Sequence, residues 1–134
     1  MAALDTNVLV RFLVRDDPVQ LVSATRLIRE AIQAAEALFV PVTVALELEW
    51  VLRSNFGFSK TTVTHTFAQL LSSTELIFES ESALEIALVL YTQSSADFSD
   101  CLHVALARQA GEGPLWTFDK AASKVEGARW VNAA

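Results

Sequence analysis

Apolar residues recur along this chain at two spacings, one typical of helices and one typical of buried strands. After Asp17-Pro18, an N-cap followed by proline at the first helical position, they return on one helix face. These residues are Leu21, Ala24, Ile28, Ala31, Ile32 and Ala35. Capping residues at the starts of apolar segments, and glycines after some of them, predict four further helices. They run from a cap at Thr43 to about Phe56 before Gly57, from a cap at Ser59 to about Leu71, from Ser82 (with Glu85 as a capping box) to about Tyr91, and from Asp97 or Ser99 to just before Gly111.

Short apolar runs between these segments predict strands. They are Ala2–Leu4, Leu38–Val42, Leu76–Phe78, Leu115–Thr117 and Trp130–Val131. Strands that alternate with helices over short connections are typical of an α/β fold with a largely parallel sheet covered on both faces. No linker, repeat or low-complexity tract interrupts the pattern, so we expect a single domain over residues 1–134.

Composition fits such a domain. With 134 residues, 52% of them hydrophobic, the chain is expected to bury roughly 68% of the surface that its unfolded form exposes. It has no run of about 18 apolar residues and no basic segment before its first strand, so we expect a cytoplasmic protein without a membrane span. Cys101 lies among apolar residues and is expected to be a small buried side chain.

Five acidic residues lie at the edges of these apolar elements: Asp5, Glu47, Asp97, Asp100 and Asp119. An isolated carboxylate in apolar surroundings costs several kcal/mol unless it is paired or binds a metal. Asp5 and Asp119 directly follow strands, where open α/β sheets bind ligands. Helix capping is an ordinary alternative for both residues.

Glu47 differs from its neighbour Glu49 in its position on the helix. At 100° per residue, Glu47 lies about 40° from Val51, at the edge of the apolar arc. Glu49 is expected to point to solvent and to pair with Arg53 one turn later. Glu47 is therefore the candidate site residue, although a buried acid held by a hydrogen bond has the same pattern.

Asp97 and Asp100 are three residues apart, which places them about 60° apart on one helix face. Attraction to the helix N-terminus is one explanation. Two such carboxylates repel each other by up to about 4 kcal/mol at 4 Å for an effective dielectric of 20, and a bound cation removes that repulsion. Oxygen ligands suit Mg²⁺ or Mn²⁺, whereas Cys101 and the two histidines lack zinc-ligand spacing. Of the two histidines, His103 either contacts the site or its substrate, or is an ordinary core or surface residue.

The net charge of −6 argues against nonspecific nucleic-acid binding, which depends on many basic residues. Removing the five candidate acids from the 16 acidic residues leaves 11 against 10 basic ones. A protein with metal at the site would therefore be nearly neutral elsewhere. Six basic residues that flank the acids are candidates for phosphate contacts or for ordinary solvation: Arg11, Arg15, Arg53, Lys60, Lys120 and Lys124.

Four segments of the chain resemble the ordered motifs of PIN domains, in particular those of the stand-alone bacterial VapC-type toxins. They are Asp5-Thr6-Asn7-Val8-Leu9, Glu47-Leu48-Glu49-Trp50-Val51-Leu52-Arg53, Asp97-Phe98-Ser99-Asp100-Cys101-Leu102-His103 and Thr117-Phe118-Asp119. The resemblance spans nearly the whole chain. It implies a three-layer α/β/α sandwich and an endoribonuclease that hydrolyses RNA phosphodiester bonds. The implied cofactor is Mg²⁺, and Mn²⁺ is a possible substitute.

The resemblance also implies partners and residue roles. Such a toxin is usually a homodimer and is inhibited by an antitoxin protein of the VapB type. Asp5 and Asp100 would be the principal metal ligands, Glu47 and Asp119 would complete the acidic site, and Asp97 would be an additional acid. Hydrogen bonds from Thr6, Asn7 and Thr117 would support them.

Three alternatives remain open. A phosphatase of the haloacid dehalogenase type is disfavoured, because it needs a second acid where this chain has Asn7. A metal-dependent nuclease acting on DNA shares the acidic cluster but needs further binding elements. A non-catalytic PIN-like interaction module would use the acids structurally and would lose no function when Asp5 becomes Asn.

Overall fold

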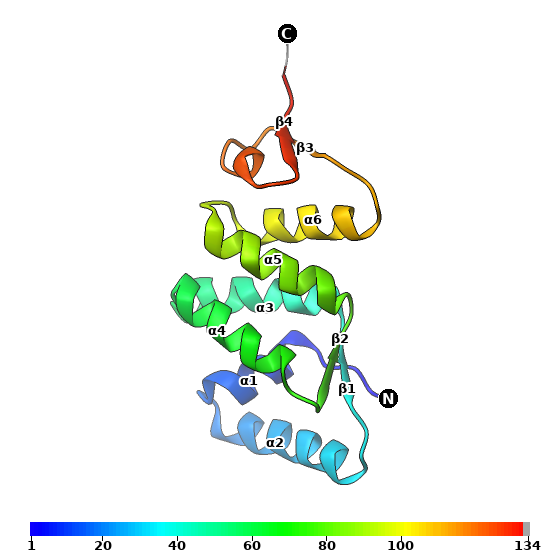
Figure 1. Cartoon of the computed structure of the whole chain (residues 1–134). Coiled ribbons are helices and arrows are strands. Elements are labelled where there is room, and N and C mark those ends of the chain that lie inside the picture. The colour runs from blue at the N-terminus through cyan, green and yellow to red at the C-terminus, as the bar shows by residue number, and fades with distance from the viewer. Residues whose placement is uncertain (133–134) are drawn as a thin grey trace. The chain divides into compact units, whose positions relative to one another are not determined.

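The structure is a computed structural model that describes residues 1–132 (Figure 1). Its elements are, in order, α1 (Thr6–Val14), α2 (Pro18–Gln33), β1 (Leu38–Val40), α3 (Val42–Ser54), α4 (Lys60–Leu71), β2 (Leu76–Phe78), α5 (Glu81–Gln93), α6 (Phe98–Gln109), β3 (Leu115–Thr117), the 3₁₀ helix η1 (Ala122–Lys124) and β4 (Ala128–Trp130). The chain divides into two compact units, residues 1–79 and residues 80–134. Each unit is described by itself.

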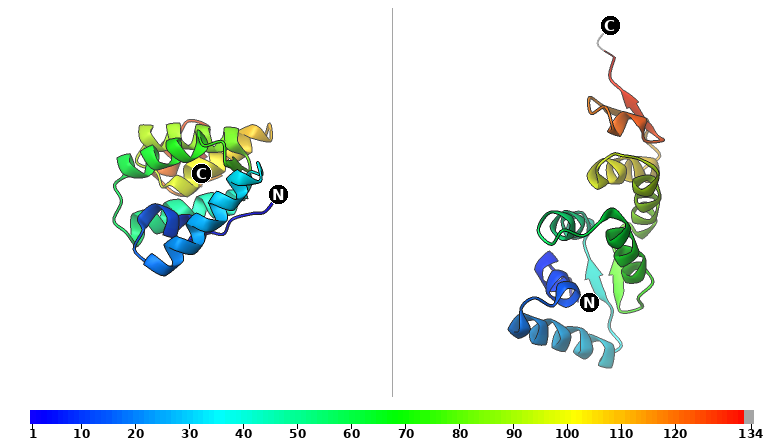
Figure 2. Two further views of the ribbon diagram at one scale, coloured as in Figure 1. Left: turned by 90° about the horizontal axis from the view of Figure 1, so that it is seen from below. Right: turned by 90° about the vertical axis from the view of Figure 1, so that its left-hand side faces the viewer.

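Unit 1, residues 1–79, is built around a parallel pair of strands. β1 pairs with β2 in a register that joins Leu38 to Leu76 and Val40 to Phe78, and Figure 2 shows the two strands side by side. Helix α1 packs against α2 and α3, and α3 packs against α4. The completely buried side chains include Leu48 and Phe67.

The expected first strand, Ala2–Leu4, is reduced to a single bridge between Ala3 and Phe39. Leu4 N donates to the Phe39 carbonyl at 2.8 Å, and Phe39 N donates to the Ala2 carbonyl at 2.8 Å, so the segment does run parallel to β1. Of its three residues, Leu4 alone is buried. The chain turns into α1 at Thr6, which leaves too few residues for a longer ladder.

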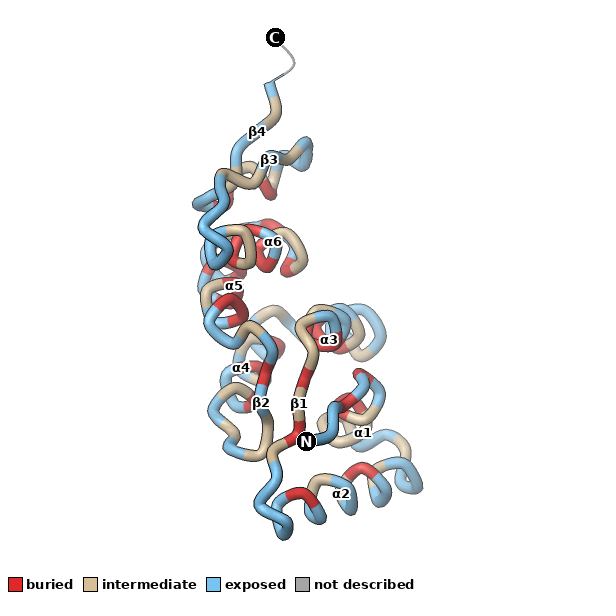
Figure 3. The backbone as a smooth tube through the Cα atoms, turned by 90° about the vertical axis from the view of Figure 1, so that its right-hand side faces the viewer, coloured by how far each residue is buried: buried red, intermediate tan, exposed pale blue. Residues whose placement is uncertain are grey.

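The N-terminus of α2 agrees with the sequence, because Asp17 caps it by accepting from Val19 N at 3.1 Å and Gln20 N at 3.0 Å. Its expected apolar face is partly wrong. Figure 3 shows α2 mostly exposed or intermediate, and its buried residues are Ala24 and Ala31. The Ile32 side chain is 51% exposed. Ala35 lies beyond the end of the helix.

Helix α3 begins differently from the prediction. β1 ends at Val40, and α3 starts at Val42 after Pro41, so Thr43 is inside the helix and is not its cap. The N-cap residue Pro41 supplies no side-chain acceptor. Instead, Val42 N donates to Oε1 of Glu79, directly after β2, at 2.8 Å. Helix α4 starts as expected, with Ser59 Oγ accepting from Thr62 N at 3.1 Å.

Unit 2 contains the helix pair α5 and α6 and the parallel strands β3 and β4. Tyr91 and Phe98 meet edge to face, with ring centroids 5.4 Å apart. The expected capping box of Ser82 and Glu85 is wrong, because α5 already begins at Glu81 after Ser80, a left-handed residue with φ of 59°. The last strand, β4, starts two residues before the predicted one.

Both units combine helices with parallel strands, which confirms the expected α/β class. Cys101 is buried, as expected, and lies 3.8 Å from the Ser94 hydroxyl. Within residues 1–132, none of the helices has the length and hydrophobicity needed to cross a membrane.

Candidate metal centre

Asp5 is placed by the short extended segment that pairs with β1. It occupies the N-cap of α1 with extended backbone angles, and its Oδ1 accepts a hydrogen bond from Thr6 N at 2.7 Å. The side chain is exposed. Asp5 therefore does act as a cap, the ordinary alternative for this residue. The capping bond occupies Oδ1, and the exposed carboxylate remains accessible to a cation.

Glu47 extends from α3 toward α1. Its Oε1 accepts a hydrogen bond from the hydroxyl of Thr6, the residue after Asp5. Thr6 is buried, with 3% of its surface exposed. One threonine thus contacts both candidate site acids of unit 1, because its backbone N–H donates to Asp5 and its hydroxyl donates to Glu47. The supporting role of Thr6 in a metal site stays a prediction.

The expectation that Glu49 points to solvent is wrong. Glu47 is exposed, whereas Glu49 is 2% exposed. The expected ion pair of Glu49 is present, with Arg53 Nε at 2.8 Å from Oε2. The helical wheel assumed one buried arc, but α3 packs against α1 and also against α4, so a second face is covered.

In unit 2, Asp97 and Asp100 lie at the N-terminus of α6, as predicted. Asp97 occupies the N-cap position, yet its side chain makes no capping hydrogen bond, and Asp100 lies in the first turn. Asp97 is exposed and Asp100 is half-buried. Capping therefore does not account for the Asp97 carboxylate.

Asp100 has a perturbed pKa. Burial raises the pKa of its carboxyl above the ordinary value of 3.8, and the negative charges of Asp119 and Asp97 raise it further. His103, one turn later and exposed, partly opposes this rise. The three acids of unit 2 thus repel one another at Asp100, as expected for carboxylates gathered without a cation.

Asp119 follows β3, as its sequence position predicted. Its backbone N–H donates to Thr117 Oγ1 at 3.0 Å, and its Oδ1 accepts from Ala122 N at 2.9 Å. The side chain is exposed, and its hydrogen bond reaches the first residue of the short helix η1. Thr117 therefore orients Asp119. Asn7 is exposed on α1 and lines a cleft against α2.

The acids fit a divalent metal by their chemistry. Their carboxylate oxygens are ligands that Mg²⁺ and Mn²⁺ prefer, and the mutual repulsion at Asp100 is the kind that a cation relieves. Asp5 and Glu47 belong to unit 1, and the other three acids belong to unit 2. Among the side chains of residues 1–132, no three His, Cys, Asp or Glu are already arranged to hold an ion.

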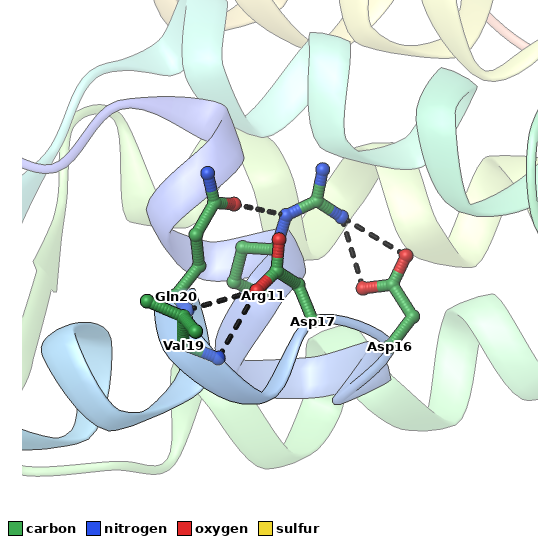
Figure 4. Close-up of polar contacts among 5 residues, drawn as sticks. All are labelled: Arg11, Asp16, Asp17, Val19 and Gln20. Atoms are coloured by element: carbon green, nitrogen blue, oxygen red, sulfur yellow. Dashed lines mark hydrogen bonds and ion pairs between the residues drawn. The ribbon is translucent and has the colours of Figure 1, made fainter.

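Arg11 and Arg53, which flank the acids, make ion pairs within the protein. Arg11 Nη1 donates to Asp16 Oδ1 at 2.9 Å and Oδ2 at 3.1 Å, and Arg11 Nε donates to Gln20 Oε1 (Figure 4). Arg53 pairs with Glu49. These contacts give Arg11 and Arg53 structural roles, whereas Lys120 and Lys124 lie exposed beside Asp119.

The family model of the PIN domain matches residues 2–128. The chain belongs to the PIN domain family. A VapC ribonuclease of Aquifex aeolicus (strain VF5) is similar to it, with 26% identity over 132 residues that cover 98% of this chain and 96% of the relative. The resemblance inferred from the four motifs is thereby confirmed, and all five acids lie within the matched part of this PIN domain.

Proposed function

We propose that this PIN domain is a metal-dependent endoribonuclease, the toxin of a type II toxin–antitoxin pair that acts in the cytoplasm. Family membership and the similarity to a VapC ribonuclease support a nuclease. The placement of Asp97 and Asp100 at the N-terminus of α6, where the Asp97 carboxylate makes no capping bond, supports metal dependence. The pKa of Asp100, raised by burial and by the charges of Asp119 and Asp97, adds to this support, because a cation would favour the ionised form. Mg²⁺ is the proposed ion, and Mn²⁺ is a substitute.

The five acids have distinct proposed roles. Asp5 and Asp100 are the principal ligands, Glu47 and Asp119 complete the acidic site, and Asp97 adds charge. A bound Mg²⁺ or Mn²⁺ would supply positive charge that stabilises a phosphate oxygen and would activate a water for attack. Thr6 holds the Glu47 carboxylate, and Thr117 fixes the backbone at Asp119.

Asp100 also links metal binding to protons. Its pKa is raised, so the protein without a cation holds this proton to higher pH than an ordinary aspartate does. A cation binds the ionised carboxylate, so at a pH where Asp100 is protonated binding would release that proton. We therefore expect metal affinity to fall as the pH falls through the pKa of Asp100.

The proposed partners are an RNA substrate, a second copy of the chain and an antitoxin of the VapB type. Exposed apolar side chains on α2 support a protein partner, since Val19 is 77% and Val22 is 56% exposed. A cleft of about 280 Å³ between α1 and α2, lined mainly by apolar atoms, adds to this surface. A monomer at micromolar concentration in light scattering would count against the homodimer.

A non-catalytic interaction module is the second candidate, and one observation favours it. Asp5 and Asp119 each already accept a hydrogen bond from a helix N-terminus, so these two acids have a structural use. The same apolar surface would then be the functional feature of the protein. This alternative requires no metal.

Cleavage of matched substrates separates the candidates. Structured RNAs and DNAs of the same sequence are incubated with the purified protein in Mg²⁺, Mn²⁺ or EDTA, after removal of any copurified inhibitor. We expect cutting of RNA that requires metal and little cutting of DNA. Preference for DNA would instead indicate a deoxyribonuclease. If neither RNA nor DNA is cut, and circular dichroism confirms correct folding, the interaction module is favoured.

A further inference from the structure

The N-terminus of α3 is capped by a residue distant in sequence. The first N–H groups of a helix have no partner within the helix, and Pro41 offers no side-chain acceptor to them. Glu79, 37 residues from Val42, supplies one, with its Oε1 2.8 Å from Val42 N. Its negative charge also lies where the helix dipole favours an anion.

Glu79 is itself fixed by the strand pair. Its backbone N–H donates to the Val40 carbonyl at 2.9 Å, which continues the β1–β2 pairing by one bond beyond Phe78. Its backbone therefore binds the last residue of β1, while its side chain binds the first residue of α3. The single residue between them, Pro41, has a restricted φ. Glu79 thus joins the end of β1 to the first residue of α3 by two hydrogen bonds.

Helix α3 carries Glu47 in its second turn, and the Glu47 carboxylate accepts the hydroxyl of Thr6 on α1. A loosened first turn changes the path of the backbone that leads to Glu47. Glu79 at the helix start and Thr6 at the carboxylate therefore restrain the same segment from two directions.

We propose that Glu79 is a positioning residue, which caps α3 and thereby holds Glu47 against Thr6 in the geometry that the acidic site uses. The effect on Glu47 follows from contacts within unit 1, and the effect on catalysis rests on the proposed nuclease function. Glu79 acts through its acceptor oxygen, so glutamine at this position retains the function and alanine loses it.

Two measurements on the same variants test the role. Amide hydrogen exchange by NMR reports on the first turn of α3 and on the Glu47 and Thr6 signals, and RNA cleavage with Mg²⁺ reports kcat and KM. The variants are Glu79→Ala and Glu79→Gln. The matched control is Glu85→Ala, which removes an exposed glutamate from α5.

In Glu79→Ala, we expect amide exchange in the first turn of α3 to become roughly fivefold faster, the usual scale for a lost cap. We also expect shifted Glu47 and Thr6 signals and a lower kcat with little change in KM. Glu79→Gln and Glu85→Ala should resemble the wild type. If Glu79 only stabilised the helix, Glu79→Ala would lower the unfolding temperature. The kcat measured well below that temperature would then be unchanged.

Three results would overturn the positioning role. They are unchanged exchange in Glu79→Ala, unshifted Glu47 and Thr6 signals, and wild-type kcat in a variant whose exchange has changed. A wild-type protein that cuts no RNA is a different outcome, since it rejects the nuclease. In that case, altered exchange and altered Glu47 signals in Glu79→Ala still support the positioning of Glu47 by Glu79.

Discussion

Thr6 and Glu47 lie 41 residues apart in the chain, and the Thr6 hydroxyl donates a hydrogen bond to Glu47 Oε1. Thr6 is 3% exposed, while Glu47 is exposed. The donor is thus held in the packed interior of unit 1 and directs a surface carboxylate. In the proposed site, this bond orients the Glu47 carboxylate through Oε1 and leaves Oε2 available to a cation.

Replacing the Thr6 hydroxyl tests the importance of this bond. Thr6→Val keeps the shape and removes the donor, and water can replace it at the exposed Glu47. We therefore expect a modest loss of about 1 kcal/mol in the free energy of unfolding. The rate of RNA cleavage should fall by more than the small rise in the unfolded fraction can explain. Thr6→Ser, which retains the hydroxyl, is the control in urea unfolding and cleavage assays; equal activity in Thr6→Val would contradict the orienting role.

Asp100→Asn should stabilise the metal-free protein. Because burial and the Asp119 and Asp97 charges raise the pKa of Asp100 above 3.8, the folded state binds its proton more tightly than the unfolded chain does. The charged form therefore costs stability above the raised pKa. That cost shrinks as the pH falls through the raised pKa and disappears below 3.8, where Asp100 is protonated in both states.

Thermal unfolding in EDTA measures this effect. We expect a higher unfolding temperature for Asp100→Asn at pH 7, with an advantage that shrinks as the pH is lowered. Asp17→Asn is the matched control, since asparagine also caps helices well and Asp17 caps α2. A large loss of stability in Asp100→Asn would instead indicate a structural hydrogen bond at this carboxylate.

The two arginine ion pairs should differ in strength. Glu49 has 3% of its side chain exposed, so Arg53→Ala leaves a buried charge without this cation and should cost about 1–2 kcal/mol. In the Arg11–Asp16 pair, the side chains are 27% and 41% exposed, and Arg11→Ala should cost below about 1 kcal/mol. Urea unfolding of both variants decides the order. A larger loss in Arg11→Ala would show that the burial argument is wrong.

Gly127 should not tolerate a side chain. Its φ is +99°, and a Cβ there would lie 2.9 Å from Val104 Cγ1 on α6. We expect Gly127→Ala to destabilise the protein by about 2 kcal/mol through backbone strain and overpacking. Adding Val104→Ala should relieve the contact part of the loss. Strictly additive losses in the two single variants and the double variant would indicate that backbone strain alone is responsible.

The starts of α2 and α4 were predicted correctly from local sequence signals, whereas the local signal at Ser82 was misleading. Asp17-Pro18 starts α2 and Ser59 starts α4, because capping bonds join residues two or three positions apart. Thr43 was the wrong cap, since the acceptor for α3 comes from Glu79 at the end of a different strand. No pattern within α3 itself contains that information.

Four candidate acids can be recognised in the sequence because they follow strands or lie at the N-terminus of a helix, namely Asp5, Asp97, Asp100 and Asp119. Asp97 and Asp100 do interact, as their spacing indicated. The burial of Glu49 was missed, because one helical wheel cannot show that α3 packs against two helices. No sequence pattern predicts the hydrogen bond between Thr6 and Glu47 either, although the motif resemblance assigned Thr6 a supporting role.

The most direct test of the central claim is RNA cleavage by the wild type, Asp5→Asn and Asp17→Asn, each with Mg²⁺, Mn²⁺ or EDTA. Asparagine at position 5 can retain the capping bond to Thr6 N, so a loss of activity there would reflect the missing charge and not a lost cap. We expect metal-dependent cutting by the wild type and Asp17→Asn, with at least a hundredfold loss in Asp5→Asn, on the order of removing one group essential to the reaction. Equal cutting by Asp5→Asn, or cutting that persists in EDTA, would contradict a metal-dependent site that includes Asp5.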